Sequence, residues 1–335
     1  MKSQTNGRPQ VFPSWVEHIG KTPLLYLKYF SEQTGNHLFG KAEFLNPAGS
    51  IKDRTALGLI LEAEKNKFLN PQTTIYEGTA GNTGIALGLI CKQKGYRCHI
   101  VLPDNQSPEK YELLRIYNIP FTTVKATSFQ DPNHFYHVAG RMAQSDPNGY
   151  WLNQFENLGN FQIHYQTTGP EIFQDLSGNI DFFASSCGTG GSFAGISCYL
   201  KEKNSYTKCY LIDPMGSGLY SYVKTGTIST SGNSITEGIG IMRLTQNFMK
   251  AQVDDALQID DQEMLKTWQE LRDQEGLALG LSSALNVCGL VKISKMWGPK
   301  NKIGVTLLCD GAQRYLSKLR HHLPHRSGIT AIPEP

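Results

Sequence analysis

One lysine in the chain is placed where its amine could react. The segment from Asn46 to Arg54 reads NPAGSIKDR, and its turn formers deliver Lys52 to what should be the first turn of a helix. A lysine amine serves as a nucleophile or a base once it is deprotonated. Taken alone, the segment would be explained more simply by a solvated lysine. A catalytic role is favoured only if other motifs in the chain support it.

Two further loops could bind anions. Thr79-Ala80-Gly81-Asn82-Thr83-Gly84 lies between an expected strand and an expected helix, where free N–H groups and the helix dipole suit a small carboxylate. Gly188-Thr189-Gly190-Gly191-Ser192 also joins a strand to a helix, and its glycines let the main chain approach a phosphate. This second loop lacks the lysine of a nucleotide-binding P-loop and the spacing of the dinucleotide fingerprint.

Short strands alternate with helices along the chain, which predicts an α/β fold with two parallel sheets. In the first half the expected elements are TTIYEG, a helix from about Asn82, CHIVLP, a helix from Pro108 capped by Ser107, FTTVKA, a helix over 134–143, and YWLNQF. In the second half they are DFFASSC, a helix from Ser192, CYLID, helices over 262–274 and 283–296, IGVTLLCD, and a helix after Gln313.

Length and composition restrict the class of protein. With 335 residues, the chain should form two lobes with a cleft between them. A net charge of +3 without a basic stripe argues against a nucleic-acid partner. No run reaches the ~18–20 apolar residues of a membrane span, and residues 1–12 are polar, so we expect a soluble cytoplasmic protein without membrane contact.

Cysteines and histidines give no sign of a metal or redox site. Seven cysteines without paired spacing should be reduced thiols, and Cys187 beside the glycine loop is expected to be a packing residue. His164 is expected to be structural. The histidines at positions 321, 322 and 325 lie on a proline-rich tail, where solvated side chains are the usual case, so we expect no metal.

Taken in order, the lysine, the carboxylate loop and the phosphate loop resemble one family closely. The chain is similar to the cysteine synthase/cystathionine β-synthase family of pyridoxal phosphate (PLP) enzymes, from Ile19-Gly20-Lys21-Thr22-Pro23-Leu24 to Arg314-Tyr315-Leu316-Ser317. Matching stretches between these ends are Asn153-Gln154-Phe155, Thr167-Thr168-Gly169-Pro170-Glu171-Ile172, Glu237-Gly238-Ile239-Gly240 and Ser282-Ser283.

The resemblance implies a tryptophan synthase β-like architecture, fold type II, with PLP in the cleft between two lobes. Each lobe would hold a twisted, mostly parallel sheet flanked by helices. The smaller, substrate-closing domain would span residues 46–155, and the larger PLP-phosphate-binding domain 1–45 and 156–320. Residues 321–335 would form a flexible tail.

The resemblance also implies roles for single residues. Lys52 would form the Schiff base with PLP and later move the α-proton of the substrate. The other cofactor-binding residues would be Asn82, Gly188, Thr189, Gly190, Gly191, Ser192 and Ser282, and the substrate-binding residues Thr79, Ala80, Gly81, Thr83 and Gln154. Ser282 would face the pyridine nitrogen, where a hydroxyl cannot keep that nitrogen protonated as a carboxylate would, which favours β-replacement over transamination.

The implied reaction is that of O-acetylserine sulfhydrylase, which makes L-cysteine and acetate from O-acetyl-L-serine and sulfide. Cystathionine β-synthase activity, with homocysteine as the thiol, is the first alternative. A serine or threonine dehydratase and a non-catalytic, partner-binding relative are further alternatives. The family also implies a homodimer and a possible complex with serine acetyltransferase.

Three positions depart from the family pattern. Ala80 stands where serine is common, Ala284 stands where glycine is common, and Ile241-Met242-Arg243 is atypical after Gly240. A missing hydroxyl at position 80 should cost about 0.5–1.5 kcal/mol of one hydrogen bond, which tunes affinity without abolishing chemistry. Asp310, after the last strand, could orient Ser282 or Arg314.

Overall fold

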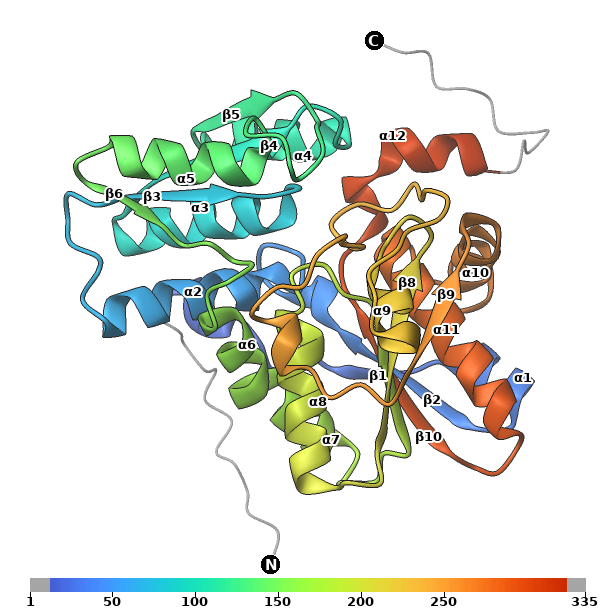
Figure 1. Cartoon of the computed structure of the whole chain (residues 1–335). Helices are drawn as coiled ribbons and strands as arrows, with labels where there is room; N and C mark the ends of the chain where they lie inside the picture. The colour runs from blue at the N-terminus through green and yellow to red at the C-terminus, as the bar shows by residue number, and fades with distance from the viewer. Residues whose placement is uncertain (1–12, 324–335) are drawn as a thin grey trace, which may run out of the picture.

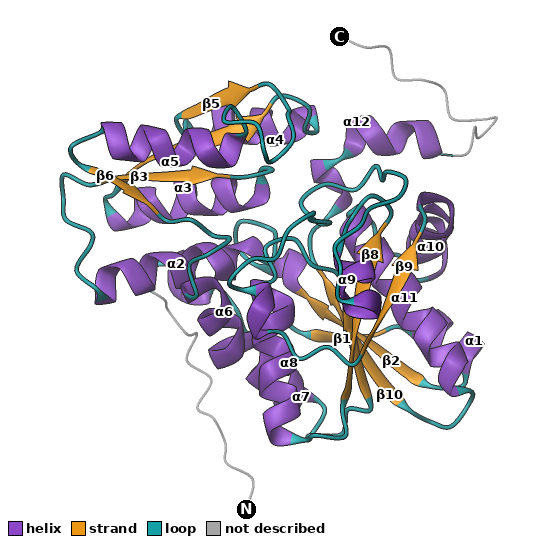
Figure 2. Ribbon diagram, in the orientation of Figure 1, coloured by secondary structure: helices purple, strands orange, loops and turns teal. Residues whose placement is uncertain are grey.

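The structure is a computed structural model that describes residues 13–323, and these residues form two α/β lobes (Figure 1). Each lobe has one β-sheet with helices packed against it (Figure 2). The expected two-lobed α/β architecture is therefore confirmed. The expectation of a flexible tail falls almost wholly on residues 324–335, which lie outside the described residues together with 1–12.

The smaller sheet has four strands in the order β5-β4-β3-β6, and every pairing in it is parallel. Its strands are β3 (Thr74–Gly78), β4 (Arg97–Pro103), β5 (Phe121–Val124) and β6 (Gly149–Trp151). The helices of this lobe are α2 (Lys52–Lys65), α3 (Asn82–Lys94), α4 (Pro108–Ile116) and α5 (Phe135–Ser145). All of these elements fall within residues 46–155, although the domain limits themselves stay a prediction.

The larger sheet has six strands in the order β1-β2-β10-β7-β8-β9. Only β1 runs antiparallel to its neighbour, so this sheet is mostly parallel, as expected. Its strands are β1 (Leu24–Tyr26), β2 (His37–Ala42), β7 (Phe182–Ser185), β8 (Lys208–Pro214), β9 (Asp255–Ile259) and β10 (Ile303–Leu308). The last strand of the chain thus lies in the interior of the sheet, between β2 and β7.

Helices of the larger lobe bury both faces of this sheet. One apolar cluster joins it to helices that include Phe30, Trp268 and Leu285, and a second joins it to helices that include Ile172 and Phe193. The helices are α1 (Lys28–Thr34), α6 (Gly159–Ile163), α7 (Gly169–Asp175), α8 (Gly191–Lys203), α9 (Leu219–Thr225), α10 (Asp261–Gln274), α11 (Leu281–Trp297) and α12 (Leu316–Leu319).

Short helical turns complete the larger lobe and its connections. They are η1 (Trp15–His18), η2 (Glu43–Leu45), the π-helical turn η3 (His164–Thr168), η4 (Phe248–Lys250), η5 (Ala312–Arg314) and η6 (Arg320–His322). Within residues 13–323, no helix combines the length and the apolar character needed to cross a membrane.

The structure corrects one helix cap. Helix α4 begins at Pro108 as predicted, but the Ser107 side chain does not cap it. Its hydroxyl donates instead to Glu237 Oε1 at 2.8 Å, and its backbone N–H donates to the same carboxylate. The Ser107 hydroxyl bonds this carboxylate, 130 residues away in the chain, instead of a backbone N–H of α4, because hydrogen bonds to ionised groups are stronger.

Candidate active site

A cavity of about 300 Å³ opens between the two lobes. Most of the residues predicted to bind cofactor or substrate line it together: Lys52, Thr79, Ala80, Gly81, Asn82, Thr83, Gln154, Gly188, Thr189 and Ser282. Gly190, Gly191 and Ser192 do not line the cavity. They continue the loop into α8, which begins at Gly191. Segments far apart in the sequence therefore meet where the sequence pattern predicted a site.

Lys52 is the first residue of α2, and the turn before it is tied to the larger lobe. The backbone N–H of Ile51 donates to the carbonyl of Cys309 at 2.9 Å, and Ser50 forms a β-bridge with Asp310. Gly49 has a φ of +87°, which glycine adopts without strain. The end of β10 thus fixes the point at which α2 begins, and with it the position of Lys52.

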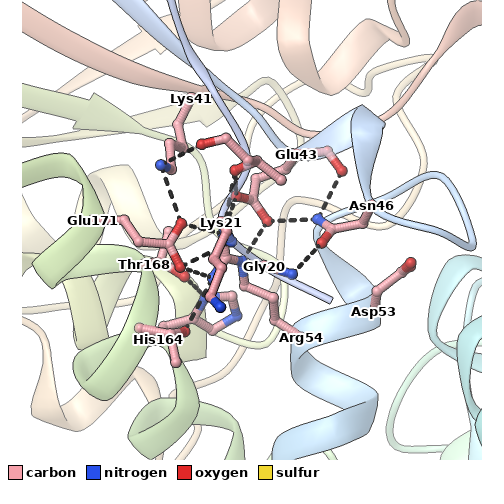
Figure 3. A network of polar contacts seen from close by, with 12 residues as sticks. Gly20, Lys21, Lys41, Glu43, Asn46, Asp53, Arg54, His164, Thr168 and Glu171 are labelled. Atoms are coloured by element: carbon pink, nitrogen blue, oxygen red, sulfur yellow. Dashed lines mark hydrogen bonds and ion pairs between the residues drawn. The ribbon is translucent and has the colours of Figure 1, made fainter. Parts of the chain in front are cut away.

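A buried ion-pair network holds the first turn of α2, which also carries Lys52 (Figure 3). The Arg54 guanidinium donates to Glu43 at 2.8 and 2.9 Å and to Glu171 at 2.7 Å through two nitrogens. Lys41 lies 3.1 Å from the same Glu171 carboxylate. Glu43 comes from η2 and Glu171 from α7, so one side chain of α2 joins it to two elements of the larger lobe.

The charges in this network stabilise each other against burial. Burial alone would raise the pKa of the Glu43 carboxyl, but the Arg54 charge and its hydrogen bonds hold that pKa below the ordinary value. Burial alone would lower the pKa of Arg54, but the charge of Glu43 raises it overall. Both groups are therefore ionised at neutral pH.

The loop predicted to bind a carboxylate has little freedom. Gly81 has a φ of +128°, and a Cβ there would lie 2.5 Å from Cδ of Lys110, so only glycine fits. The Thr79 hydroxyl accepts from the Gly81 N–H at 3.0 Å. The Thr83 hydroxyl donates to Gln154 Oε1 at 2.8 Å, and Gln154 Nε2 donates to the Gly78 carbonyl at 2.8 Å.

Asn82 is held from both sides by residues that follow β10. Its Nδ2 donates to Asp310 Oδ2 at 2.6 Å, and its Oδ1 accepts from Arg314 Nη1 at 2.7 Å. Because arginine only donates and an ionised carboxylate only accepts, these partners fix which amide atom is oxygen. The second N–H of Nδ2 has no acceptor within residues 13–323, so it is available to a ligand. Asp310 also accepts from the Tyr315 hydroxyl, so its partners are Asn82 and Tyr315 rather than Ser282 or Arg314.

The glycines of the Gly188–Ser192 loop are required by close packing. A Cβ at Gly188 would lie 2.2 Å from the Gly238 carbonyl, and one at Gly191 would lie 2.4 Å from the Asn160 side chain. Gly190 has a φ of +91° and its Cβ would meet the Phe248 backbone at 2.6 Å. The loop runs directly into α8, whose first N–H groups have no acceptor within the helix and favour an anion.

A family model described as "Pyridoxal-phosphate dependent enzyme" matches residues 16–310. The chain belongs to this family. It is therefore an enzyme whose cofactor is pyridoxal phosphate, as the resemblance in its sequence implied.

Relatives with the name cysteine synthase are similar along nearly the whole chain. The "Cysteine synthase 1" of Neurospora crassa is 44% identical over 323 residues, covering 94% of this chain and 86% of the relative. The "Cysteine synthase 1" of Emericella nidulans is 45% identical over 326 residues, covering 95% and 88%. Among solved structures, the O-acetylserine dependent cystathionine beta-synthase from Helicobacter pylori has a TM-score of 0.84 and 30% identity, covering 92% of this chain and 99% of that one.

The cavity of this PLP enzyme fits the cofactor. Three groups in this cavity are chemically suited to PLP: a lysine amine for its aldehyde, a glycine loop at a helix start for its phosphate, and an amide N–H for its ring oxygen. Ser282, in the first turn of α11, supplies a neutral hydroxyl to the same cavity. A buried acceptor, Asp310 Oδ1, has no partner among the described residues, as expected where a polar ligand belongs.

Other residues near the site are structural. His164 is buried and hydrogen-bonded to Thr168 at 2.9 Å and Thr55 at 3.3 Å, and burial lowers its pKa well below the ordinary value, so the ring is neutral. Cys187 is buried in an apolar cluster, where burial raises the pKa of its thiol well above the ordinary value. All seven cysteines are free thiols.

Several residues that line the cavity have no role predicted from the sequence. Lys110 of α4 forms a buried ion pair with Glu237 at 2.5 Å and donates to the carbonyl of Ala80 at 3.2 Å. Glu237 belongs to a stretch that was matched to the family but given no role. Arg243 also lines the cavity, and its only signal in the sequence was the atypical segment after Gly240.

Glu77, near the end of β3, contacts Gln154, which is bonded to the loop predicted to bind a carboxylate. One of its carboxylate oxygens accepts from the Gln154 N–H at 3.2 Å, and the other has no partner among the described residues. Burial raises the pKa of Glu77 from 4.5 to about 8, so the side chain is protonated at neutral pH. A neutral acid can stay buried here at a modest cost.

We expect Arg54→Met to destabilise the protein by about 3–5 kcal/mol, because it leaves the buried Glu43 carboxylate without its cation. The free energy of unfolding in urea measures the loss. Arg115→Met, at an exposed position, is the matched control and should change stability by less than about 0.5 kcal/mol. Equal stability of the two variants would contradict a positioning network at Arg54.

We expect Glu77→Gln to change the pH dependence of stability. The folded-state pKa is raised from 4.5 to about 8, so below pH 4.5 the group is protonated in both states and contributes nothing. As pH rises from 4.5 to about 8, only the unfolded state loses the proton, and the wild type should lose about 1.4 kcal/mol per unit from this group.

The amide side chain of the Glu77→Gln variant does not titrate, so the difference in unfolding free energy between the variant and the wild type should grow across this pH window. Urea unfolding at intervals from pH 5 to pH 9 measures it. Glu112→Gln, at an exposed position, serves as the control. A constant difference at all pH values would show that Glu77 is ionised in the folded protein.

Proposed function

We propose that this PLP enzyme is a cysteine synthase, which makes L-cysteine and acetate from O-acetyl-L-serine and sulfide. The observation that carries the proposal is the meeting of Lys52, the Thr79–Thr83 loop and the neutral Ser282 in one cavity. The relatives named cysteine synthase, at 44% and 45% identity, support the same reaction. When bound, PLP supplies an electron-withdrawing ring that stabilises negative charge on the α-carbon of an amino acid.

Different residues would bind the cofactor and transfer the proton in this reaction. Lys52 Nζ would hold the cofactor aldehyde and then, once free, take the α-proton of the substrate. The Gly188–Ser192 loop and the start of α8 would bind the phosphate. Asn82, through its free N–H, would donate to the ring oxygen, and Ser282 would hydrogen-bond the ring nitrogen without protonating it.

The substrate loop would bind the amino-acid carboxylate at the start of α3. The Thr79 hydroxyl and the backbone N–H groups of Ala80 and Thr83 would donate there, Ala80 in place of the more common serine hydroxyl. The Gly81 N–H is already bonded to the Thr79 hydroxyl. Gln154 is bonded to Thr83 and would turn toward the carboxylate from the same side. The buried pair Lys110–Glu237 joins the two lobes beside this loop, which would keep water out of the cavity during the reaction.

We also propose the partners and the location that the family implies. A homodimer is tested by size-exclusion chromatography with light scattering, and a cytoplasmic location by cell fractionation. A complex with serine acetyltransferase would place a peptide carboxylate in the loop that binds the substrate carboxylate, so substrate should displace it.

We expect Lys52→Ala to lose both the visible absorption of bound cofactor and the formation of cysteine. The purified wild type should absorb in the visible range, change its spectrum when O-acetylserine is added, and recover it when sulfide is added. Lys65→Ala, at an exposed position on the same helix, is the control and should behave as the wild type. Cysteine production by Lys52→Ala at the wild-type rate would overturn the proposal. Pyruvate from serine alone would indicate a dehydratase.

We expect Arg314→Gln to weaken cofactor binding about 10-fold, because the Asn82 amide loses the donor that fixes its orientation. Equilibrium dialysis of PLP measures the affinity. Arg320→Gln, at an exposed position in the same segment, is the matched control. Equal affinities would show that Asn82 keeps its orientation without Arg314.

A further inference from the structure

Arg243 lies at the cavity in a cage of aromatic rings. Its guanidinium carbon is 4.4 Å from the ring centre of Phe129, 4.9 Å from that of Tyr136 and 5.1 Å from that of Phe155. Cations are attracted to the faces of such rings. Phe129 and Tyr136 come from the segment between β5 and α5 and from the start of α5, whereas Arg243 comes from the loop between α9 and η4. The side chain therefore reaches across from the larger lobe to the smaller one.

Glu156 fixes the remaining freedom of this guanidinium. Its carboxylate forms an ion pair with Nη1 of Arg243, and its other oxygen accepts from the Gln246 N–H at 2.8 Å. The Arg243 side chain is only 19% exposed. A guanidinium that is caged by rings and bonded along one edge presents its other edge in a defined direction.

That other edge has no partner. Arg243 Nη2 is buried and makes no hydrogen bond to the described residues, and the same holds for Thr127 Oγ1. Both residues line the cavity that contains Lys52. Buried polar atoms in folded proteins are almost always satisfied, and a buried charged donor is the most costly kind to leave unpaired. Two such atoms, on residues that line the same cavity, indicate a ligand that accepts hydrogen bonds.

The charge around Arg243 indicates which ligand. Among the described residues that line the cavity, the other lysine and arginine side chains are Lys52, which the proposed function assigns to the cofactor, and Lys110, which is paired with Glu237. Burial lowers the pKa of His134 to about 4, so this neighbour is neutral at pH 7. Glu156 already offsets part of the Arg243 charge. One free edge of a partly neutralised guanidinium suits a monoanionic carboxylate better than a phosphate dianion.

We propose that Arg243 Nη2 and Thr127 Oγ1 form a second anion subsite, which binds a carboxylate on the side of the substrate remote from its amino-acid group. The inference rests on the proposed function, because it deepens the specificity of the same site. The carboxylate has two sources: the acetate that leaves, and a carboxylate carried by a thiol that replaces sulfide. In the second case the thiol loses its proton, its sulfur bonds to the β-carbon, and acetate leaves with the electron pair of the C–O bond.

Two thiols of equal size test whether the subsite binds a carboxylate carried by the thiol. The holoenzyme is assayed with O-acetylserine and either 3-mercaptopropionate or its neutral amide, 3-mercaptopropanamide. The wild type should prefer the carboxylate thiol, and Arg243→Gln should lower the ratio of the two kcat/KM values about 10-fold or more, as expected for the loss of a hydrogen bond to a charged group. Arg243→Lys keeps the charge without the planar fork and should retain part of the preference.

A pair of amino-acid donors tests the first source. O-Acetylserine releases a carboxylate and β-chloroalanine releases chloride. If Arg243 binds the departing acetate, Arg243→Gln should lower kcat/KM for O-acetylserine about 10-fold more than for β-chloroalanine. A change in either the thiol ratio or the donor ratio supports the subsite and identifies its ligand.

Binding without turnover supplies an independent measurement. Saturation-transfer NMR should detect propionate on the wild-type holoenzyme, and the signal should fall in Arg243→Gln and, to a smaller extent, in Thr127→Val. Arg115→Gln is the matched control, because Arg115 also lies over an aromatic ring, at 5.7 Å from Phe121, but on the exposed surface. It should retain the wild-type signal and both wild-type ratios.

The inference is overturned if both ratios stay within about threefold of the wild-type values and propionate binds equally to all variants. Failure of the proposed function gives a different result: the wild type would then form no cysteine from O-acetylserine and sulfide. The propionate measurement does not depend on that reaction, so the two failures are distinguishable.

Discussion

The position of Lys52, the proposed catalytic lysine, depends on the ion pairs of one arginine. Arg54 lies two residues after Lys52 and bonds two carboxylates of the larger lobe, Glu43 and Glu171. A buried ion pair of this kind is not a strong source of stability, because desolvation offsets much of the attraction. The ion pairs instead fix orientation. A planar guanidinium can bond two carboxylates at once in few orientations of the helix that carries it. Replacement of the whole network by apolar residues could preserve stability and still misplace the amine.

The smaller lobe meets the cofactor site through residues that lie after β10. Asp310 and Arg314 hold Asn82, Tyr315 holds Asp310, and Ser317 donates to Glu109 of α4. These bonds join one short segment to the starts of two helices in the other lobe. The geometry of the proposed substrate loop is therefore coupled to the position of the larger lobe, and a shift of either lobe would move the residues that we propose bind the cofactor.

Local chemistry explains what could be predicted from the sequence. Turn formers and glycines made Lys52, the Thr79–Gly84 loop and the Gly188–Ser192 loop candidates, because the conformation of a strand-to-helix turn is encoded within a few residues. The roles of single residues such as Asn82 came from the family resemblance and stay predictions. Ser107 was misassigned, because its partner Glu237 is 130 residues away and no local rule refers to it. Lys110 and Arg243 were missed for the same reason. The long-range pairs Lys110–Glu237 and Arg243–Phe129 exist only once both lobes are in place.

The strand order of the larger sheet has a consequence for synthesis on the ribosome. The chain makes β2 early and β10 last, yet β10 pairs with β2 on one side and with β7 on the other. Until residue 308 has left the exit tunnel, the strands on either side have exposed edges that can pair with other nascent chains. The strands of the smaller sheet lie between residues 74 and 151, so all of them leave the tunnel well before β10. The small sheet can therefore form while the large sheet is still incomplete, and this interval is when a chaperone would be needed most.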